Sequence, residues 1–515
     1  MFLHNLQGKA LTAAITITCG TGFLLFGYDQ GVFGGLLSNN AFIRTFGNPN
    51  ATIQGQIVST YDIGCVLGAI SSIFFGDKLG RRRSIILGCC LVIIGGTIQT
   101  ASYHLPQMII GRIIAGLGTG MNTTAIPMWQ SETSQAKDRG KLIVIQLVLV
   151  LGGIVITNWM NFGFTFTPDT QVSWRFPLAF QDFFAILTII FISFLPESPR
   201  WLVMKGRRDE ARVIIARLLS KPQEDQQVID DLSIICDSVA RAEEQGNFGW
   251  REAFRNGKKQ TFRRILLGAG PSFMQQMGGT NVVAYYLPVV LVRSFGFSNR
   301  LSLILSACDS ISLMFWGSMA TLLIDRVGRK NLMLMGAFTQ SICFCMAGMG
   351  LSFNTNRGSI LAVTFIFLYY VFYGLSFLSI PFMYPSEINS QHMRNTGSAV
   401  AMVTNWLFVY VVVLITPDGI ANLGWKFYLM FGIINFCFLP IIWHFFVETA
   451  GLSLEEIDRL FEIKYENPSI SYKEATKLAQ AEFAYLLHGK NSEKDAEKDG
   501  EYTAAVEDVT SDGSK

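Results

Sequence analysis

Long apolar segments separated by short polar loops recur along most of the chain. Each is long enough to cross about 30 Å of hydrocarbon as a helix. The pattern predicts an all-α membrane protein with six transmembrane helices in each half of the chain. The predicted spans are residues 11–33, 56–76, 84–103, 107–129, 141–162, 175–195, 263–291, 301–324, 331–353, 359–384, 396–416 and 425–446.

Two polar segments divide and follow these spans. Apolar residues within 211–219 and 228–235 have helical spacing, so short helices are expected between the halves. The last stretch is acidic and poor in core-forming residues, so we expect a largely disordered tail. The predicted domains are 1–199, an N-terminal six-helix bundle; 200–262, a cytoplasmic linking segment; 263–460, a C-terminal six-helix bundle; and 461–515, a cytoplasmic tail.

Composition and charge agree with a membrane protein. Of the 515 residues, 50% are hydrophobic and only 15% are charged, which is too apolar for a soluble chain of this length. A net charge of +3 gives no indication of a nucleic-acid partner. Lys and Arg concentrate in one set of alternating short loops, which predicts that this side and both termini are cytoplasmic.

Several kinds of chemistry find no support in the sequence. The cysteines lack the C-x-x-C spacing of a metal site, and no nucleophile–base pair or Walker A motif is present. We therefore predict no enzyme, no cofactor and no metal. The glycines of Gly116-x-Gly118-x-Gly120 lie in an apolar span, which favours close helix packing over a nucleotide-binding loop.

One modification site is a candidate. Asn50-Ala51-Thr52 is an N-glycosylation sequon in the first predicted external loop, and whether it is used stays open. A second sequon at Asn122 lies within a predicted span and should be silent.

Three charged signatures at predicted cytoplasmic helix ends occur twice. Their offsets are 248, 255 and 251 residues, which indicates duplication of a six-helix unit. The acids and arginines of these signatures are Asp77, Arg81, Glu132, Arg139, Glu197, Arg200, Asp325, Arg329, Glu387, Arg394 and Glu448.

We predict that these charges form a cytoplasmic gate. Such groups can pair between helices or halves in one conformation and separate into water in another at little cost, so they bias a conformational equilibrium without freezing it. The alternative is that they only set topology. That alternative explains the arginines but not the repeated acids.

The same segments resemble the signatures of a known family. GDKLGRR at 76–82, PESPR at 196–200, DRVGR at 325–329 and YPSE at 384–387 are similar to motifs of the sugar porters of the major facilitator superfamily. Between about residues 8 and 462 the sequence most resembles fungal sugar and polyol transporters. The resemblance implies two pseudo-symmetric bundles around a central solute site, and a plasma-membrane location.

Ionisable groups within the spans need a reason, because each costs about 2.5–3.5 kcal/mol on insertion scales. Asp29 lies inside the first span and Arg112 opens the fourth. The resemblance implies that this pair couples transport to a proton, while a static salt bridge stays an alternative. Asp62 is expected to be wet or locally satisfied. Asp309 is a second titratable group or the partner of a cation, with neither favoured.

Amides in the seventh span point to a neutral ligand rich in hydroxyls, because each offers donors and acceptors without charge. They flank Gly278 and Gly279, so we expect this helix to be broken. Ordinary interhelical hydrogen bonding is the alternative. By resemblance, the central site comprises Gln146, Gln275, Gln276, Asn281, Asn405 and Trp406, with Phe382 where many sugar porters have a Trp.

These features together predict a secondary active transporter. By alternating access it would take up a hexose, a pentose or a small polyol with a proton across a lipid bilayer. A facilitative sugar uniporter is the nearest alternative. A non-transporting sugar sensor is a more distant one, because the predicted tail is only about fifty residues long.

Overall fold

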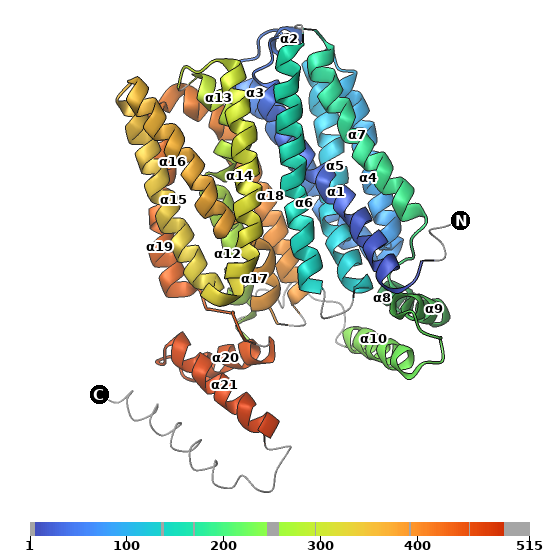
Figure 1. The fold of residues 1–515 in the computed structure, drawn as a ribbon. Coiled ribbons are helices and arrows are strands. Elements are labelled where there is room, and N and C mark those ends of the chain that lie inside the picture. Colours follow the sequence, from blue (N-terminus) through green and yellow to red (C-terminus); the bar gives the residue numbers. More distant parts are fainter. Residues whose placement is uncertain are drawn as a thin grey trace.

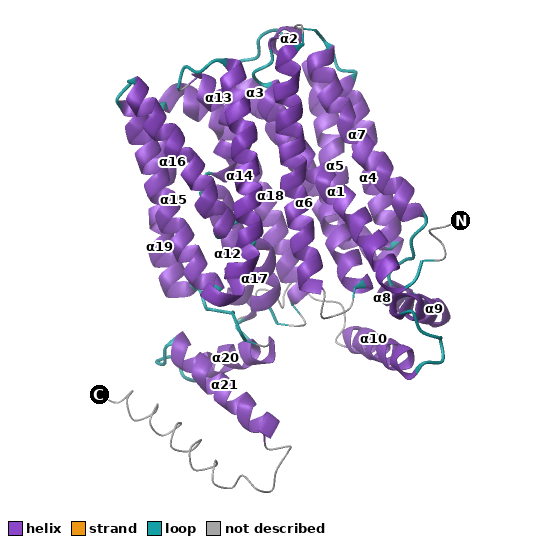
Figure 2. Cartoon of the chain, viewed as in Figure 1, coloured by secondary structure: helices purple, strands orange, loops and turns teal. Residues whose placement is uncertain are grey.

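The computed structural model describes residues 6–134, 139–167, 170–244, 257–293, 295–390, 393–452 and 454–488. Within these ranges the regular secondary structure is helical, and the long helices run side by side in two groups (Figures 1 and 2). Nine helical segments of this part of the chain are long and apolar enough to cross a membrane. Helices α3, α5 and the α12–α13 pair lie among them and complete twelve spans.

The first bundle contains six uninterrupted spans. They are α1 (Gly8–Leu36), α3 (Ala51–Leu79), α4 (Arg81–Thr100), α5 (Leu105–Thr133), α6 (Arg139–Gly163) and α7 (Val172–Ser193). Helix α5 packs against α3 and α4, while α1 packs against α6 and α7. The short helix α2 (Asn40–Thr45) lies at one end of this bundle (Figure 1).

The second bundle also has six spans, but two of them are broken. They are α12 (Thr261–Met277) with α13 (Thr280–Arg293), α14 (Asn299–Val327), α15 (Arg329–Ser352), α16 (Asn356–Leu375) with α17 (Ile380–Ile388), α18 (Arg394–Leu423) and α19 (Trp425–Phe445). The break at Gly278 and Gly279 was predicted and is confirmed, with Gly279 at φ +88°. The break between α16 and α17 was not predicted.

Short helices gather at the end of the bundles opposite α2 (Figure 1). Helices α8 (Pro199–Met204), α9 (Arg208–Leu219) and α10 (Gln226–Glu244) lie below the first bundle, and α20 (Leu454–Glu466) and α21 (Tyr472–His488) below the second. We call this the inner end, because the loop charges predict that it is cytoplasmic, and the α2 end the outer end.

The expectation of a largely disordered tail was wrong for residues 461–488. This stretch completes α20 and forms α21, and it buries Phe461 of α20 and Ala475 and Ala479 of α21. The fully buried Arg264 of α12 makes a salt bridge with Asp458, which ties α20 to the bundle. The apolar residues of this stretch have the spacing of an amphipathic helix, which a composition this polar does not show. Residues 489–515 lie outside the described residues.

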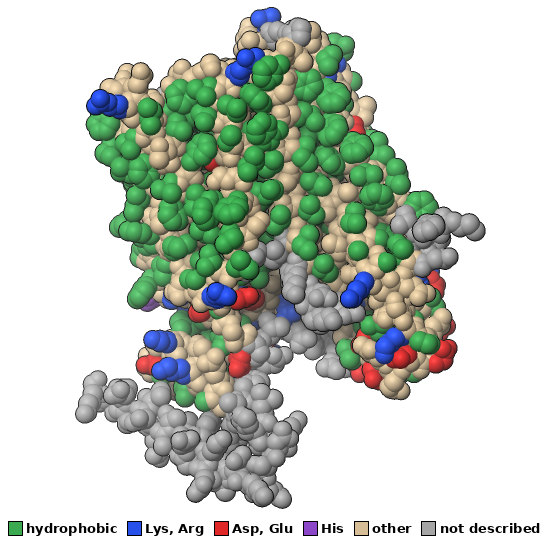
Figure 3. Space-filling view, viewed as in Figure 1, with side chains coloured by type: hydrophobic (Ala, Val, Ile, Leu, Met, Phe, Trp, Pro, Cys, Tyr) green, Lys and Arg blue, Asp and Glu red, His purple; other side chains and the backbone are tan. Residues whose placement is uncertain are grey.

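The surface matches a bilayer environment. Hydrophobic side chains cover the visible flanks of both bundles, and charged side chains gather at the two ends (Figure 3). Large apolar residues such as Leu322, Ile360 and Trp443 are more than 60% exposed, which is costly in water and favourable in lipid. The chain is therefore a multi-pass membrane protein.

The two bundles meet along α1 and α13, α3 and α18, and α6 and α14. At the outer end, Thr52 donates a hydrogen bond to Asp418 at 3.0 Å. Asn299 donates another to the carbonyl of Ser38 at 3.2 Å. These bonds hold the outer ends of the bundles together in this conformation.

Candidate functional site

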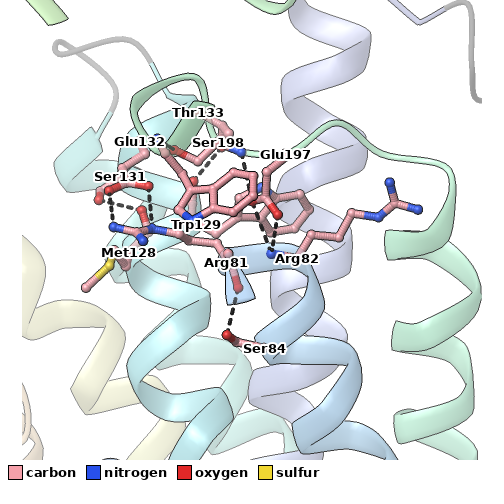
Figure 4. Close-up of polar contacts among 12 residues, drawn as sticks. Arg81, Arg82, Ser84, Met128, Trp129, Ser131, Glu132, Thr133, Glu197 and Ser198 are labelled. Atoms are coloured by element: carbon pink, nitrogen blue, oxygen red, sulfur yellow. Dashed lines mark hydrogen bonds and ion pairs between the residues drawn. The ribbon is translucent and has the colours of Figure 1, made fainter. Parts of the chain in front are cut away.

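The first bundle has a charge cluster at its inner end, where α3 turns into α4 (Figure 4). Arg81 donates two hydrogen bonds to Glu132, from Nε at 2.9 Å and from Nη2 at 3.1 Å. Glu197 accepts the backbone N–H of Arg82 at 3.2 Å, which caps α4. Gly80 makes the turn at φ +92°, and a Cβ there would lie 2.8 Å from Glu197 Oε2. The turn therefore needs glycine.

The second bundle repeats this arrangement where α14 turns into α15. Arg329 donates to Glu387 from Nη2 at 2.8 Å and from Nε at 3.2 Å. Glu448 accepts the backbone N–H of Lys330, the counterpart of Arg82, at 3.0 Å, and also that of Arg329 at 2.8 Å. Gly328 turns at φ +90°, and Asp325 adds a further salt bridge to Arg329 at 2.8 Å. The duplication is thus preserved at the level of individual contacts.

Both clusters join helices within one bundle. The pairs Arg81–Glu132 and Arg329–Glu387 each form within one bundle, and neither pair bridges the two halves in this conformation. Arg200 is exposed, with no hydrogen bond or ion pair among the described residues, so the structure does not bring it into the cluster. Arg394 is half-buried at the start of α18. The side chains of Asp77 and Arg139 lie outside the described part of the chain.

A chain of amides lies inside the second bundle. Gln276 donates to the side-chain oxygens of Asn405 at 2.7 Å and of Gln275 at 3.0 Å, and it accepts from Asn281 at 2.7 Å. Gln275 donates to the carbonyl of Phe377 at 2.8 Å, in the break between α16 and α17. The structure therefore brings together four amides from α12, α13 and α18.

Two buried donors from opposite bundles have no hydrogen-bond partner among the described residues. They are Nε2 of Gln146 on α6 and Nε1 of Trp406 on α18. The Trp406 ring meets Phe26 of α1 edge to face across the bundle boundary, with ring centroids 5.5 Å apart. An unpaired buried donor costs about 1–3 kcal/mol, so each is suited to a ligand hydroxyl. Phe382 is half-buried in α17.

The carboxylate of Asp29 is fully buried in the first bundle. Its Oδ2 accepts a hydrogen bond from the hydroxyl of Tyr61 at 3.1 Å. The guanidinium of Arg112 lies between two rings, 4.1 Å from the centroid of Phe33 and 4.3 Å from that of Tyr61. Asp29 and Arg112 are therefore linked through Tyr61 and do not form a direct ion pair among the described contacts. Tyr61 was missed because an apolar pattern does not show where its hydroxyl points.

Close packing of α5 on α3 places the arginine. A Cβ on Gly116 would lie 2.1 Å from the carbonyl oxygen of Tyr61, so only glycine permits this approach. One turn earlier, Arg112 donates to the carbonyls of Ile57 at 3.2 Å and Val58 at 2.9 Å. The helix-packing interpretation of the glycine motif is confirmed, and it explains why Arg112 lies against the backbone of α3.

Two further carboxylates are more deeply buried than their sequence context indicated. Asp62 on α3 has no exposed surface, and neither of its oxygens has a hydrogen-bond partner among the described residues. The expectation that it would be wet or locally satisfied was wrong, because α3 packs against both α5 and α18 and leaves Asp62 no exposed surface. Asp309 on α14 is buried in the same way.

The two sequons differ in exposure. Asn50 is exposed before α3, where its side-chain oxygen accepts the backbone N–H of Ile53 at 2.9 Å and caps the helix. Asn122 is only 3% exposed inside α5, which agrees with a silent sequon.

Comparison with known proteins identifies relatives along nearly the whole chain. Residues 14–461 match the model of the family described as sugar (and other) transporter. The chain is 42% identical over 476 residues to the MFS-type transporter oryC of Aspergillus oryzae, covering 90% of this chain and 88% of that one. It is 36% identical over 487 residues to the sugar transporter STL1 of Saccharomyces cerevisiae, covering 92% and 85%.

Among solved structures, the chain resembles XylE of E. coli. In the complex of this proton:xylose symporter with 6-bromo-6-deoxy-D-glucose, the TM-score is 0.73 at 24% identity, covering 88% of this chain and all of that one. This similarity confirms the predicted fold of two six-helix bundles. The relatives are named as transporters, in line with the prediction that the chain is not an enzyme.

Proposed function

Because the chain belongs to the sugar transporter family of the major facilitator superfamily, we propose that it takes up a neutral monosaccharide or small polyol together with a proton by alternating access. The observation that carries the proton coupling is the buried group of Asp29, Tyr61 and Arg112. A carboxylate can gain and lose a proton, whereas arginine keeps its charge. The fold is also that of the proton:xylose symporter XylE.

Asp29 is proposed as the proton carrier. Its ionised form is stabilised by the hydroxyl of Tyr61 and by the nearby charge of Arg112. Protonation removes the attraction to Arg112, so the contacts between α1, α3 and α5 weaken. One proton can thus change which arrangement of the helices is favoured.

The solute is proposed to bind at the amide chain of the second bundle. Gln276 and its three neighbours satisfy one another in this conformation, so a hydroxylated solute can exchange with these bonds at little cost. The unpaired donors of Gln146 and Trp406 add contacts from both bundles. Phe382 offers an aromatic face for a sugar ring without an indole donor.

The two charge clusters are proposed to act as the inner gate. Each holds three helix ends in one bundle through a buried arginine, so each bundle moves as one body. We further place both termini in the cytoplasm and the protein in the plasma membrane, on the loop charges and the resemblance to fungal transporters.

Proteoliposomes test the coupling. D-Xylose, D-glucose, D-sorbitol and glycerol are added in turn to the purified protein, and uptake and external pH are followed. We expect at least one solute to raise the external pH as it enters. In Asp29→Asn, accumulation driven by a proton gradient should vanish while solute exchange persists. Undiminished accumulation in this variant would contradict the assignment, and uptake with no pH change would favour the uniporter.

A further inference from the structure

Asp62 is a buried carboxylate that the proposed mechanism has not used. It follows Tyr61 directly on α3, has no exposed surface, and both of its oxygens lack hydrogen-bond partners among the described residues. An ionised carboxylate buried without partners is strongly unfavourable. Its environment must therefore supply either a proton or a compensating charge.

Arg112 lies beside the turn of α3 that carries Asp62. Its Nη2 donates to the carbonyl of Val58, one helical turn before Asp62, at 2.9 Å. Tyr61, the residue before Asp62, has its ring centroid 4.3 Å from the guanidinium and donates its hydroxyl to Asp29, so the charge of Arg112 lies near both carboxylates. Arg112 forms an ion pair with neither of them among the described residues. Its third nitrogen, Nη1, has no partner among the described residues. One arginine therefore serves two buried carboxylates.

The other titratable groups around Asp62 do not add positive charge. Asp182 of α7 accepts a hydrogen bond from Thr97 at 3.4 Å, and Asp418 of α18 accepts one from Thr52 at 3.0 Å at the outer end. The titratable groups near Asp62 are Arg112 of α5, Tyr61 and Cys65 of α3, and Tyr285 and Tyr286 of α13, and the hydroxyl of Tyr61 connects this set to Asp29. Arg112 is the cation of this set.

A charge count then fixes the number of protons. With both carboxylates ionised the group carries a net charge of −1, and with one proton it is neutral. A site closed to water favours the neutral state. The group of Asp29, Asp62 and Arg112 therefore keeps one proton while it is occluded and releases it when it opens to water.

We propose that Asp62 is a second proton-binding carboxylate, which shares one arginine and one transported proton with Asp29. This inference rests on the proposed proton coupling. The two carboxylates titrate as a pair, so the proton belongs to the group and not to Asp29 alone. The tyrosines of α13 bring the second bundle to the same group, which gives the proton a direct influence on the contact between the bundles.

Asp62→Asn tests the proposal. This variant leaves Arg112 to Asp29 alone, so the group is neutral without a proton and binds one only in more acidic medium. We expect the pH of half-maximal coupled uptake to fall by about one unit or more, because the substitution removes a like charge beside Asp29, and a neighbouring charge shifts the titration of a carboxyl group by about that amount. Solute exchange at equal pH should stay within about threefold of the wild type, because Asn keeps the shape of the side chain.

Asp309→Asn is the matched control. Asp309 is equally buried and unpartnered, but no charged group acts on it among the described residues. The pH of half-maximal coupled uptake in Asp309→Asn should equal that of the wild type. In Asp62→Glu, which keeps a carboxylate at this position, it should lie close to the wild-type value. Measurements use proteoliposomes between about pH 4.5 and 8.5, a window that extends from just above the ordinary carboxyl range through histidine titration. The solute is whichever of the four gives the largest uptake.

The outcomes separate the two ideas. An unchanged midpoint in Asp62→Asn would overturn the shared-proton proposal, and so would loss of exchange in that variant, because a neutral isostere should leave the solute site intact. A wild type that moves no protons with any transported solute would instead overturn the proposed function.

Discussion

At the inner end the two bundles are built alike, whereas inside the membrane they differ. Arg81 and Arg329 make matching two-pronged contacts with Glu132 and Glu387. Between the ends, the first bundle holds buried carboxylates around Arg112, and the second holds a chain of amides. Rigid-body motion of the two bundles requires that the helix ends of each bundle be held together, so the charge clusters occur in both. One proton site and one solute site are sufficient for transport, so these need not be duplicated.

One pair of positions shows the divergence directly. Asp29 and Asn281 lie 252 residues apart, close to the offset of the duplicated charges, in the first and seventh spans. A carboxylate can accept a proton, and an amide of nearly the same shape cannot, although it can donate and accept hydrogen bonds. We infer that after duplication the first bundle specialised for the proton and the second came to supply most of the solute site, with Gln146 as the contribution of the first bundle.

The largest effect should come from removing the cation of the first bundle. Arg112→Gln leaves two carboxylates without their counter-charge, and breaking a buried charge interaction costs about 3–5 kcal/mol. Coupled uptake should therefore fall by about 100-fold or more between pH 5 and 8, measured as initial rates in proteoliposomes.

Arg175→Gln is the control for that loss, because Arg175 is a partly exposed arginine of the same bundle that bonds to the carbonyls of Thr100 and Ser102. It should transport within about threefold of the wild type, as surface interactions are weak. If Arg112→Gln took up solute with a proton at the wild-type rate, the proposal that the first bundle carries the proton site would be contradicted.

The duplicated clusters should respond equally to equivalent changes. Glu132→Gln and Glu387→Gln each weaken a charge-assisted contact worth roughly 1.5–3 kcal/mol. We expect each to slow uptake by about tenfold or somewhat more and to lower the melting temperature of the purified protein by similar amounts. If one variant transports at the wild-type rate while the other is slowed, the two clusters do not share the gate role.

Much of the architecture could be predicted from apolar runs and turn residues, but not where every helix is interrupted. The adjacent glycines Gly278 and Gly279 predicted the break in the seventh span. The tenth span, 359–384, has no such pair and resembles one continuous helix. Its break leaves the carbonyl of Phe377 free to accept from Gln275, a contact between helices about 100 residues apart. That partner could not be identified from local sequence.

The sequence was sufficient to predict which residues belong to the site. It was not sufficient to predict which of them contact one another. Asp29 and Arg112 were recognised because charge inside an apolar span is rare. Their link through Tyr61 depends on which face of α3 meets α5, and Gly116 and its neighbours determine that face. The burial of Asp62 depends on the packing of α3 against both α5 and α18. Helix periodicity alone leaves that face undetermined for a helix that is apolar on most sides.

A smaller and different effect is expected in the amide chain. Gln276→Leu removes the donor to Gln275 and Asn405 and the acceptor for Asn281, which leaves buried polar groups unpaired. We expect the KM for the solute to rise by about tenfold while the pH midpoint of uptake stays unchanged, because no charge is altered. Kinetics at several pH values measure both quantities.

Gln340→Leu is the control, because it removes a buried amide of the same bundle that lies outside the amide chain. Gln340 is also a buried amide, but its hydrogen bond goes to Ser376 and not to the chain. Its KM should stay near the wild-type value. A shift of the pH midpoint in Gln276→Leu would show that the second bundle takes part in proton handling, against the division of roles proposed here.

The smallest expected effect tests whether an unpaired donor faces the solute. Trp406→Phe keeps an aromatic ring against Phe26 but deletes the Nε1–H, which has no partner among the described residues. If the donor binds a solute hydroxyl, the KM should rise by about threefold to tenfold, the equivalent of one hydrogen bond of about 0.5–1.5 kcal/mol. The melting temperature without solute should not fall, because no bond within the protein is lost. A lower melting temperature with an unchanged KM would instead make Trp406 a packing residue, and would leave Gln146 as the unpaired donor available to the solute.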